Sequence, residues 1–135
     1  MDIIGDILRG TRTIATVGMS TDENKSAHAI PASLLERGFD VIPVHPEAGE
    51  ILGRTAYRRV EDIPQQVDVV QVFRPSHEAA DVARSAVAAG ATTLWLQAGI
   101  SSPEARAIAE EAGLRYVENY CLGKEAARRN FTVAA

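Results

Sequence analysis

The sequence predicts an α/β fold: a Rossmann-like, three-layer α/β/α arrangement with a mostly parallel sheet of five strands. Short β-prone runs alternate with longer segments of helical periodicity, and glycine or proline separates most of them. Near the start, a β-prone run over 13–17 stops at Gly18, and a small polar loop leads into a helical pattern at Lys25. This strand–loop–helix order is typical of nucleotide-binding domains, because loop amides and a helix N-terminus can hold a phosphate.

Length and composition limit the classes of protein. The 135 residues, 46% hydrophobic and 24% charged, predict a single domain over 1–135 with one core. The formal net charge of −4 argues against a nucleic-acid-coating protein. The apolar runs are too short to span a membrane, and the N-terminus lacks the basic region of a secretory signal. We therefore expect a cytoplasmic protein that binds neither nucleic acid nor membrane. A protein partner or a homo-oligomer stays open.

The first part of the predicted fold contains two helices and two strands. Apolar side chains at helical spacing open the chain before Gly10, and a second helical pattern ends at Gly38. Pro31 lies inside this second pattern, so we expect its first turns to be kinked or to form a separate short turn. The expected elements are a helix over 2–10, a strand over 13–18, a helix over 25–37 and a strand over 39–44.

The rest of the chain continues the alternation after a less regular segment. Residues 45–66 are rich in glycine and proline and predict a long connection with a short helix near 60–63. Ser101 or Ser102 is the expected cap of a later helix whose first turn contains Pro103. The remaining expected elements are strands over 67–73, 92–96 and 114–117, and helices over 75–89, 103–113 and 122–130.

In open parallel sheets, ligands bind beyond the carboxyl ends of the strands, so the residues that follow each strand are the candidates for a site. Gly18, Met19 and Ser20 follow the first strand, and Lys25 stands at the helix start. Glycine lets a ligand approach the backbone, the serine hydroxyl can donate to phosphate, and the lysine adds positive charge. The alternative is that this loop only caps the helix and that Lys25 is solvated. The dinucleotide fingerprint G-x-G-x-x-G is absent, which argues against NAD binding in the standard manner.

The second and third strands are followed by groups suited to a nucleotide. Pro43 and Val44 are predicted to form a wall for an adenine ring, or else a purely structural turn with Pro46. His45 is a weak candidate for a base, and the sequence predicts no metal site because no second ligand lies at suitable spacing. After the third strand, Arg74 can reach a phosphate, and the neighbouring Phe73 can pack against an adenine or a pantetheine chain. The alternative places Phe73 in the core and Arg74 on the surface.

The last two strands are followed by small and polar residues. Gln97, Ala98 and Gly99 follow the fourth strand, and the small residues among them leave room for an extended chain. After the fifth strand, Asn119 can hydrogen-bond a ligand amide. Cys121 is the only cysteine, and no histidine lies near it in sequence to activate it. The favoured interpretation of Cys121 is a buried small residue. The alternative is a mixed disulfide with a thiol ligand.

An ordered set of strand-end motifs runs through the chain. They are Val17-Gly18-Met19-Ser20 with Lys25 and His28, Pro43-Val44-His45-Pro46, Gly53 with Tyr57, Val72-Phe73-Arg74-Pro75, and Asn119-Tyr120-Cys121-Leu122. With these motifs the sequence resembles the family of small stand-alone CoA-binding proteins, over about residues 10–130. That family is similar to the N-terminal CoA-binding domain of the succinyl-CoA synthetase α subunit.

The resemblance implies a Rossmann-like fold that holds coenzyme A across the strand ends. It also implies which segment of CoA each group of candidate residues would contact. By position, Gly18, Ser20 and Lys25 would meet the pyrophosphate, Pro43, Val44 and His45 the adenosine, Phe73 and Arg74 the nucleotide and pantetheine, and Gln97, Gly99 and Asn119 the pantetheine path.

We therefore expect a single domain that binds CoA or an acyl-CoA and carries no catalytic residue. The synthetase's second domain, with its phosphorylated histidine, has no counterpart in this sequence, so we expect no acyl-CoA ligase activity from this chain alone. Two alternatives stay open. One is an enzyme that uses CoA or a nucleotide for acyl or ligase-type transfer, and the other is an NAD(P)-binding regulatory module.

Overall fold

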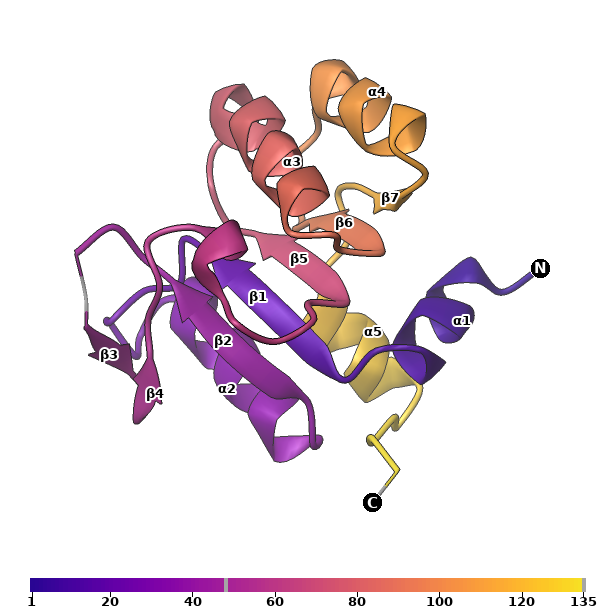
Figure 1. Ribbon diagram of the computed structural model, residues 1–135. Helices are drawn as coiled ribbons and strands as arrows, with labels where there is room; N and C mark the ends of the chain where they lie inside the picture. Colours follow the sequence, from indigo (N-terminus) through magenta and orange to yellow (C-terminus); the bar gives the residue numbers. More distant parts are fainter. Residues whose placement is uncertain (48, 135) are drawn as a thin grey trace.

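A parallel sheet of five strands lies between two layers of helices in the computed structural model, which describes residues 1–47 and 49–134 (Figure 1). The predicted fold class is confirmed. All neighbouring strands of this sheet are parallel, and the chain reverses its winding direction beside the central strands. Across the sheet, the order is β2 (Asp40–Val44), β1 (Thr13–Val17), β5 (Val69–Val72), β6 (Thr93–Leu96) and β7 (Arg115–Val117).

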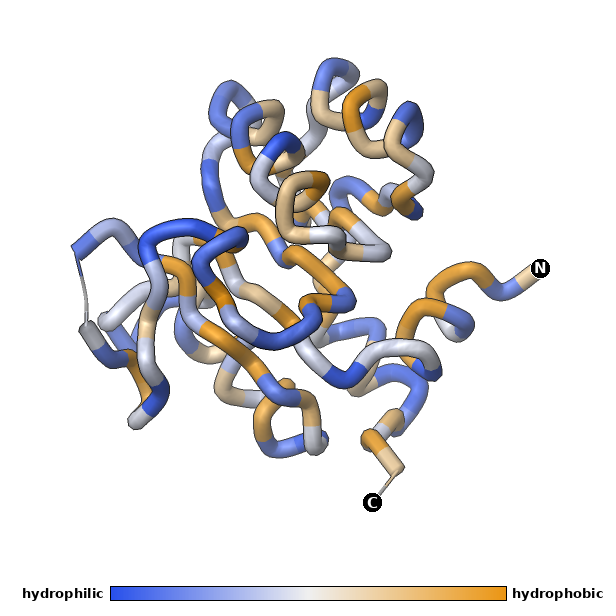
Figure 2. The backbone as a smooth tube through the Cα atoms, viewed as in Figure 1, coloured by the Kyte–Doolittle hydropathy of each residue, from blue (hydrophilic) through white to orange (hydrophobic). Residues whose placement is uncertain are grey.

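Side-chain alternation along the strands divides the core into two layers. Ile14 packs in one hydrophobic cluster and its neighbour Ala15 packs in the other, because successive side chains of a strand point to opposite faces. Figure 2 shows hydrophobic residues concentrated along these central strands. One cluster is covered by α3 (Ala79–Ala88) and α4 (Pro103–Glu111), and the other by α1 (Ile3–Arg9), α2 (Ser26–Glu36) and α5 (Leu122–Arg128).

A row of buried polar side chains crosses the sheet near its carboxyl edge. The Thr16 hydroxyl donates to Gln71 Oε1 at 2.8 Å, and Gln71 Nε2 donates to Gln97 Oε1 at 3.2 Å. The same Gln97 oxygen accepts the backbone N–H of Leu122, the first residue of α5, at 3.2 Å. Because buried polar groups must be paired, this row fixes the position of α5 against the sheet.

The connection between β2 and β5 contains a feature that the sequence did not predict. A two-stranded antiparallel hairpin is formed by β3 (Glu50–Ile51) and β4 (Arg54–Thr55), and its turn residues Leu52 and Gly53 both have positive φ. Strands of two residues are too short to show an alternating pattern, so the periodicity of the sequence could not predict them. The short helix expected near 60–63 is present as η1 (Val60–Asp62).

The helices agree with the sequence except in detail. A 3₁₀ turn, η2 (Ser76–Glu78), precedes α3 where the pattern predicted one continuous helix. Pro31 does not divide the second helix, because α2 runs without interruption from Ser26 to Glu36. Ser102 is the side-chain cap of α4, with its hydroxyl accepting the Ala105 N–H at 3.0 Å. Within the described part of the chain, every helix is too short or too polar to cross a bilayer.

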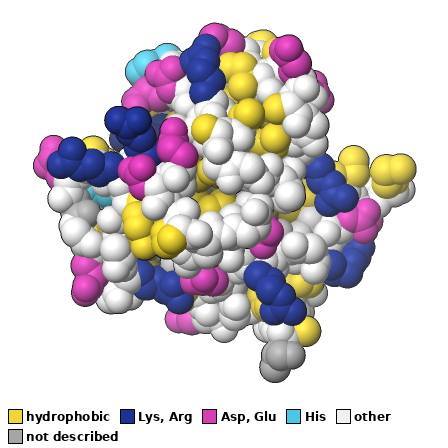
Figure 3. All heavy atoms as spheres, viewed as in Figure 1, with side chains coloured by type: hydrophobic (Ala, Val, Ile, Leu, Met, Phe, Trp, Pro, Cys, Tyr) yellow, Lys and Arg dark blue, Asp and Glu magenta, His cyan; other side chains and the backbone are white. Residues whose placement is uncertain are grey.

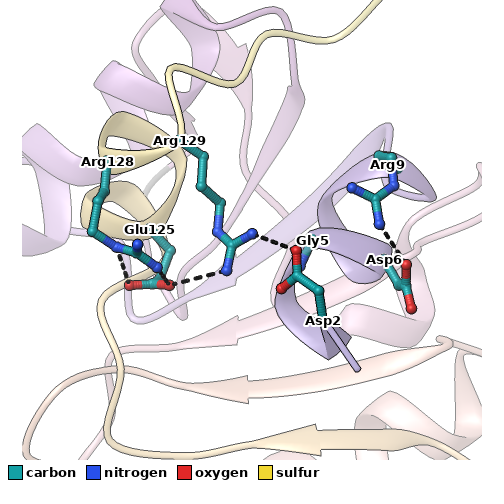
Figure 4. A network of polar contacts seen from close by, with 7 residues as sticks. All are labelled: Asp2, Gly5, Asp6, Arg9, Glu125, Arg128 and Arg129. Atoms are coloured by element: carbon teal, nitrogen blue, oxygen red, sulfur yellow. Dashed lines mark hydrogen bonds and ion pairs between the residues drawn. The ribbon is translucent and has the colours of Figure 1, made fainter.

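An ionic network joins the first helix to the last (Figure 4). Asp2 caps α1 by accepting the Gly5 N–H at 3.1 Å, and its other oxygen accepts a hydrogen bond from Arg129 Nη1 at 2.7 Å. Arg129 also lies 3.8 Å from the Glu125 carboxylate, which pairs with Arg128 at 2.8 Å. The Arg129 hydrogen bond, supported by the Gly5 amide, lowers the pKa of Asp2 to about 2.

The Asp2 carboxylate should make stability depend on pH. Its pKa is lower in the folded chain, so its contribution is present above the ordinary value of 3.8 and is lost as the pH falls toward 2. Asn is also a good N-cap, so Asp2→Asn removes the charge and keeps the cap. Thermal unfolding should show Asp2→Asn less stable than the wild type near neutral pH, with the difference shrinking at acid pH. A difference that stays constant through this range would contradict the role of the ion pair.

Candidate functional site

A cleft of about 580 Å³ opens at the carboxyl ends of β1, β2 and β5. From β1 the chain continues to β2 on one side, and from β2 it crosses to β5 on the other side of β1. The cleft therefore lies at the topological switch point, where open α/β sheets bind their ligands. In Figure 3, basic and acidic side chains lie close together at the upper left, the side toward which β1 and β2 point in Figure 1.

Gly18 forms the floor of the cleft immediately after β1. Its φ of +84° is in the left-handed region, and its N–H donates to the Val44 carbonyl at 3.1 Å. The Arg74 side chain crosses directly over it, because a Cβ at this position would lie 2.7 Å from Arg74 Cδ. Glycine is therefore required here for both backbone conformation and space.

Both backbone polar groups of Ser20, its N–H and its carbonyl, contact residues of α2. Its N–H donates to the Ala27 carbonyl at 3.1 Å, and its carbonyl oxygen lies 2.8 Å from His28 Nδ1. Within a helix, the Ala27 carbonyl would accept the N–H of residue 31, but Pro31 has none. The proline thus leaves a carbonyl that instead fixes the loop. Since a carbonyl oxygen only accepts, His28 carries its hydrogen on Nδ1.

The N-terminus of α2 stays open toward the cleft. Lys25 is the N-cap residue and makes no side-chain capping hydrogen bond, and the first turn contains no acidic residue. The N–H groups of Ser26 and Ala27 have no intrahelical acceptor. The Ser20 hydroxyl accepts the Asp22 N–H at 3.0 Å and keeps its own hydrogen for donation. These donors and the helix dipole make a site for an anionic group, which the capping alternative does not explain.

Three basic side chains line the cleft, and they differ in their partners. Arg74 is paired with Glu78 through two hydrogen bonds, Nε to Oε1 at 3.2 Å and Nη2 to Oε2 at 2.8 Å. Lys25 and Arg58 make no ion pair with any residue that the structure describes. An incoming anion therefore meets two available cations and one that is already occupied.

A protein-family model described as a CoA binding domain matches residues 12–127. The chain belongs to this family. The resemblance seen in the strand-end motifs is thereby confirmed.

Three similar proteins illustrate the family. The uncharacterized protein YneT of Bacillus subtilis is 30% identical over 119 residues, 88% of each chain. A hypothetical protein from Pyrococcus horikoshii is 38% identical, with a TM-score of 0.90 over 93% of this chain and 88% of its own. The dinucleotide-forming acetyl-coenzyme A synthetase 1 of Ca. Korarchaeum cryptofilum is 29% identical, with a TM-score of 0.74. That match covers 84% of this chain and 27% of the synthetase.

The structure brings most of the predicted site residues of this CoA binding domain into one cleft. Met19 is among them although its side chain is buried, with 1% exposed. The predicted residues that line the cleft are Gly18, Met19, Ser20, Lys25, Val44, His45, Phe73 and Arg74.

The other four predicted residues lie outside the lining of the cleft. Pro43 is inside β2. Gln97 is 3% exposed, and its side-chain oxygen is occupied by Gln71 and Leu122. Asn119 and Gly99 are exposed and bonded to each other, with Asn119 Oδ1 accepting the Gly99 N–H at 2.7 Å. Their predicted place along a pantetheine path stays a prediction.

The sequence did not predict two charged residues of the cleft, Arg58 and Glu78. Glu78 carried a detectable signal, because it follows Arg74 by four residues at the start of a helical pattern, the spacing of a helical ion pair. Arg58 lies in the long connection and follows no predicted strand. It reaches the cleft because Tyr57 donates its N–H to the Pro43 carbonyl at 3.0 Å, extending the edge of β2.

Gly18→Ala should destabilise the fold by more than its backbone conformation explains. Gly90 provides the control, because its φ is +72° and nothing lies within 4 Å of a Cβ built there. Each alanine costs about 1–2 kcal/mol for the left-handed backbone. Only Gly18→Ala must also displace Arg74, so urea unfolding should show the larger loss of stability for this variant. Equal losses in the two variants would mean that Arg74 moves aside freely.

Proposed function

We propose that the chain binds coenzyme A, or an acyl-CoA, in the cleft at the carboxyl ends of β1, β2 and β5, and that it is not itself catalytic. The observation that carries this proposal is the open N-terminus of α2, with Lys25 beside it and the Ser20 loop fixed against it. Membership of the CoA binding domain family supports the same ligand. The pyrophosphate would accept hydrogen bonds from the N–H groups of Ser26 and Ala27 and from the Ser20 hydroxyl.

The non-catalytic part of the proposal rests on the nucleophile and base candidates. Cys121 is buried, with 9% exposed, and it does not line the cleft. His28 Nδ1 is engaged by the Ser20 carbonyl, and Nδ1 of His45, the base candidate in the cleft, accepts the Glu47 N–H at 3.0 Å. This arrangement supports the packing interpretation of Cys121 over a mixed disulfide. The synthetase relative is far longer than this chain, so its activity is not carried over.

The NAD(P)-binding alternative is disfavoured by the loop after β1. In the usual dinucleotide fold, the second glycine of the fingerprint lets the backbone approach the pyrophosphate and the third packs the helix against the strand. Here Ser20 and Glu23 stand at those two positions. The loop is instead closed by hydrogen bonds from the Asp22 N–H to Ser20 Oγ and from the Asn24 N–H to Asp22 Oδ1, each 3.0 Å long. A loop stabilised by such turns suits a phosphate but is not the dinucleotide loop.

Isothermal titration calorimetry tests the proposed ligand and its phosphate contacts. CoA should bind more tightly than NAD or ATP. Lys25→Ala and Arg74→Ala should each weaken CoA binding by about 1.5–3 kcal/mol, the range for hydrogen bonds to charged groups. The loss of binding free energy in Arg74→Ala should lie at the low end of this range, because the Arg74 side chain must leave Glu78 before it can bind a phosphate.

Lys124 and Arg115 provide matched controls, because both are exposed and lie outside the cleft. Their alanine variants should bind CoA as the wild type does, and circular dichroism should show all four variants folded. Preferential binding of NAD by the wild type would overturn the proposal. Unchanged CoA affinity in both cleft variants would place the phosphates elsewhere.

Glu78 should act as a competitor of the ligand, because its carboxylate occupies Arg74 and adds negative charge to the cleft. Glu78→Gln should therefore strengthen CoA binding by about twofold to fivefold, the size of one exposed ion pair. Glu104→Gln is the control, since it removes the carboxylate that pairs with Arg84 outside the cleft. Weaker binding to the Glu78 variant would show that the pair helps to hold the ligand rather than oppose it.

A further inference from the structure

A smaller hollow of about 160 Å³ adjoins the cleft and shares part of its wall. Its apolar surface comes from Val17, Val44, Val60 and Val82, on β1, β2, η1 and α3. Val17, Val44 and Val82 also line the main cleft, so the two spaces share a wall of valines. The site therefore has a polar compartment at the N-terminus of α2 and an apolar one beneath η1 and α3.

The apolar compartment suits the flat ring of a nucleotide better than the polar one does. Binding sites use apolar walls to cover rings and a few polar groups to fix their orientation. The phosphate donors, Ser20 and the N-terminus of α2, belong to the other compartment. A CoA molecule whose pyrophosphate lies at α2 would thus place its adenine among the valines.

Arg58 stands at the boundary between the two compartments, because it lines both. The Arg58 backbone is positioned by the preceding residue, Tyr57. The Tyr57 N–H donates to the Pro43 carbonyl, and the Tyr57 carbonyl accepts the His45 N–H at 2.8 Å. On the other side, buried Val60 anchors the start of η1. The guanidinium has no ionic partner among the residues described, so its donors are available to a ligand.

We propose that Arg58 binds the 3′-phosphate on the adenosine ribose of CoA, and that the chain thereby distinguishes CoA from dephospho-CoA. This inference rests on the proposed function. The ribose links adenine to the pyrophosphate, so its phosphate falls between the two compartments, where Arg58 stands. A planar guanidinium can hold a phosphate through two parallel hydrogen bonds. Asp81, at the rim of the apolar hollow, is already paired with Arg84 at 2.7 Å, so it does not compete for the Arg58 guanidinium.

The test compares CoA with dephospho-CoA, which differ only in this phosphate. Calorimetry on the wild type should show CoA binding about tenfold or more tightly, as expected for hydrogen bonds to a charged group. Arg58→Gln should weaken CoA to the affinity of dephospho-CoA and leave dephospho-CoA unchanged. Arg59→Gln, in the neighbouring exposed arginine that lines only the small hollow, should keep the preference.

The outcomes separate this inference from the proposed function. Arg58 does not bind the 3′-phosphate if Arg58→Gln weakens the binding of CoA and dephospho-CoA equally, or if Arg59→Gln is the variant that loses the preference for CoA. In either case CoA still binds, so the proposed function stands. If the wild type binds neither ligand, the proposed function fails and the inference fails with it. Arg58 is exposed, so Arg58→Gln should fold, and its thermal unfolding should match that of Arg59→Gln.

Discussion

The register of three strands sets the geometry on which the site depends. Val17, the last residue of β1, is paired with Val44 on one side and with Val72 on the other. Three strands therefore end at the same level, and the loops that begin at Gly18, His45 and Phe73 leave the sheet side by side. Without this alignment, the N-terminus of α2, the edge of β2 and Arg74 would not share one cleft.

The second constraint is the attachment of the loop after β1 to α2. Pro31 removes one helical donor, and the Ala27 carbonyl that it leaves accepts the Ser20 N–H instead. A residue that weakens a helix interior by itself thus becomes part of the support of the loop. Because the Ser20 backbone is fixed in advance, less conformational entropy has to be lost when an anion binds.

The sequence predicted the sheet, the helices and most of the cleft, because strand ends and helix starts carry strong local signals. It did not predict the hairpin β3–β4, whose strands are too short for periodicity, or the boundary position of Arg58, which depends on Tyr57 pairing with the β2 edge. Gln97 was predicted to line the ligand site but lies outside the cleft. It follows a strand, yet its oxygen is occupied by the buried row that holds α5, a contact between segments far apart in the sequence.

The proposed function places CoA in the cleft at the ends of β1, β2 and β5. The most direct test is a titration of the isotope-labelled protein with CoA, followed by the amide signals in NMR spectra. With CoA in the cleft, we expect the largest shifts at Gly18, Ser26 and Ala27 and at residues 73–78, with small shifts around the α1–α5 network of Asp2 and Arg129. Shifts centred away from the cleft, or none at saturating CoA, would contradict it.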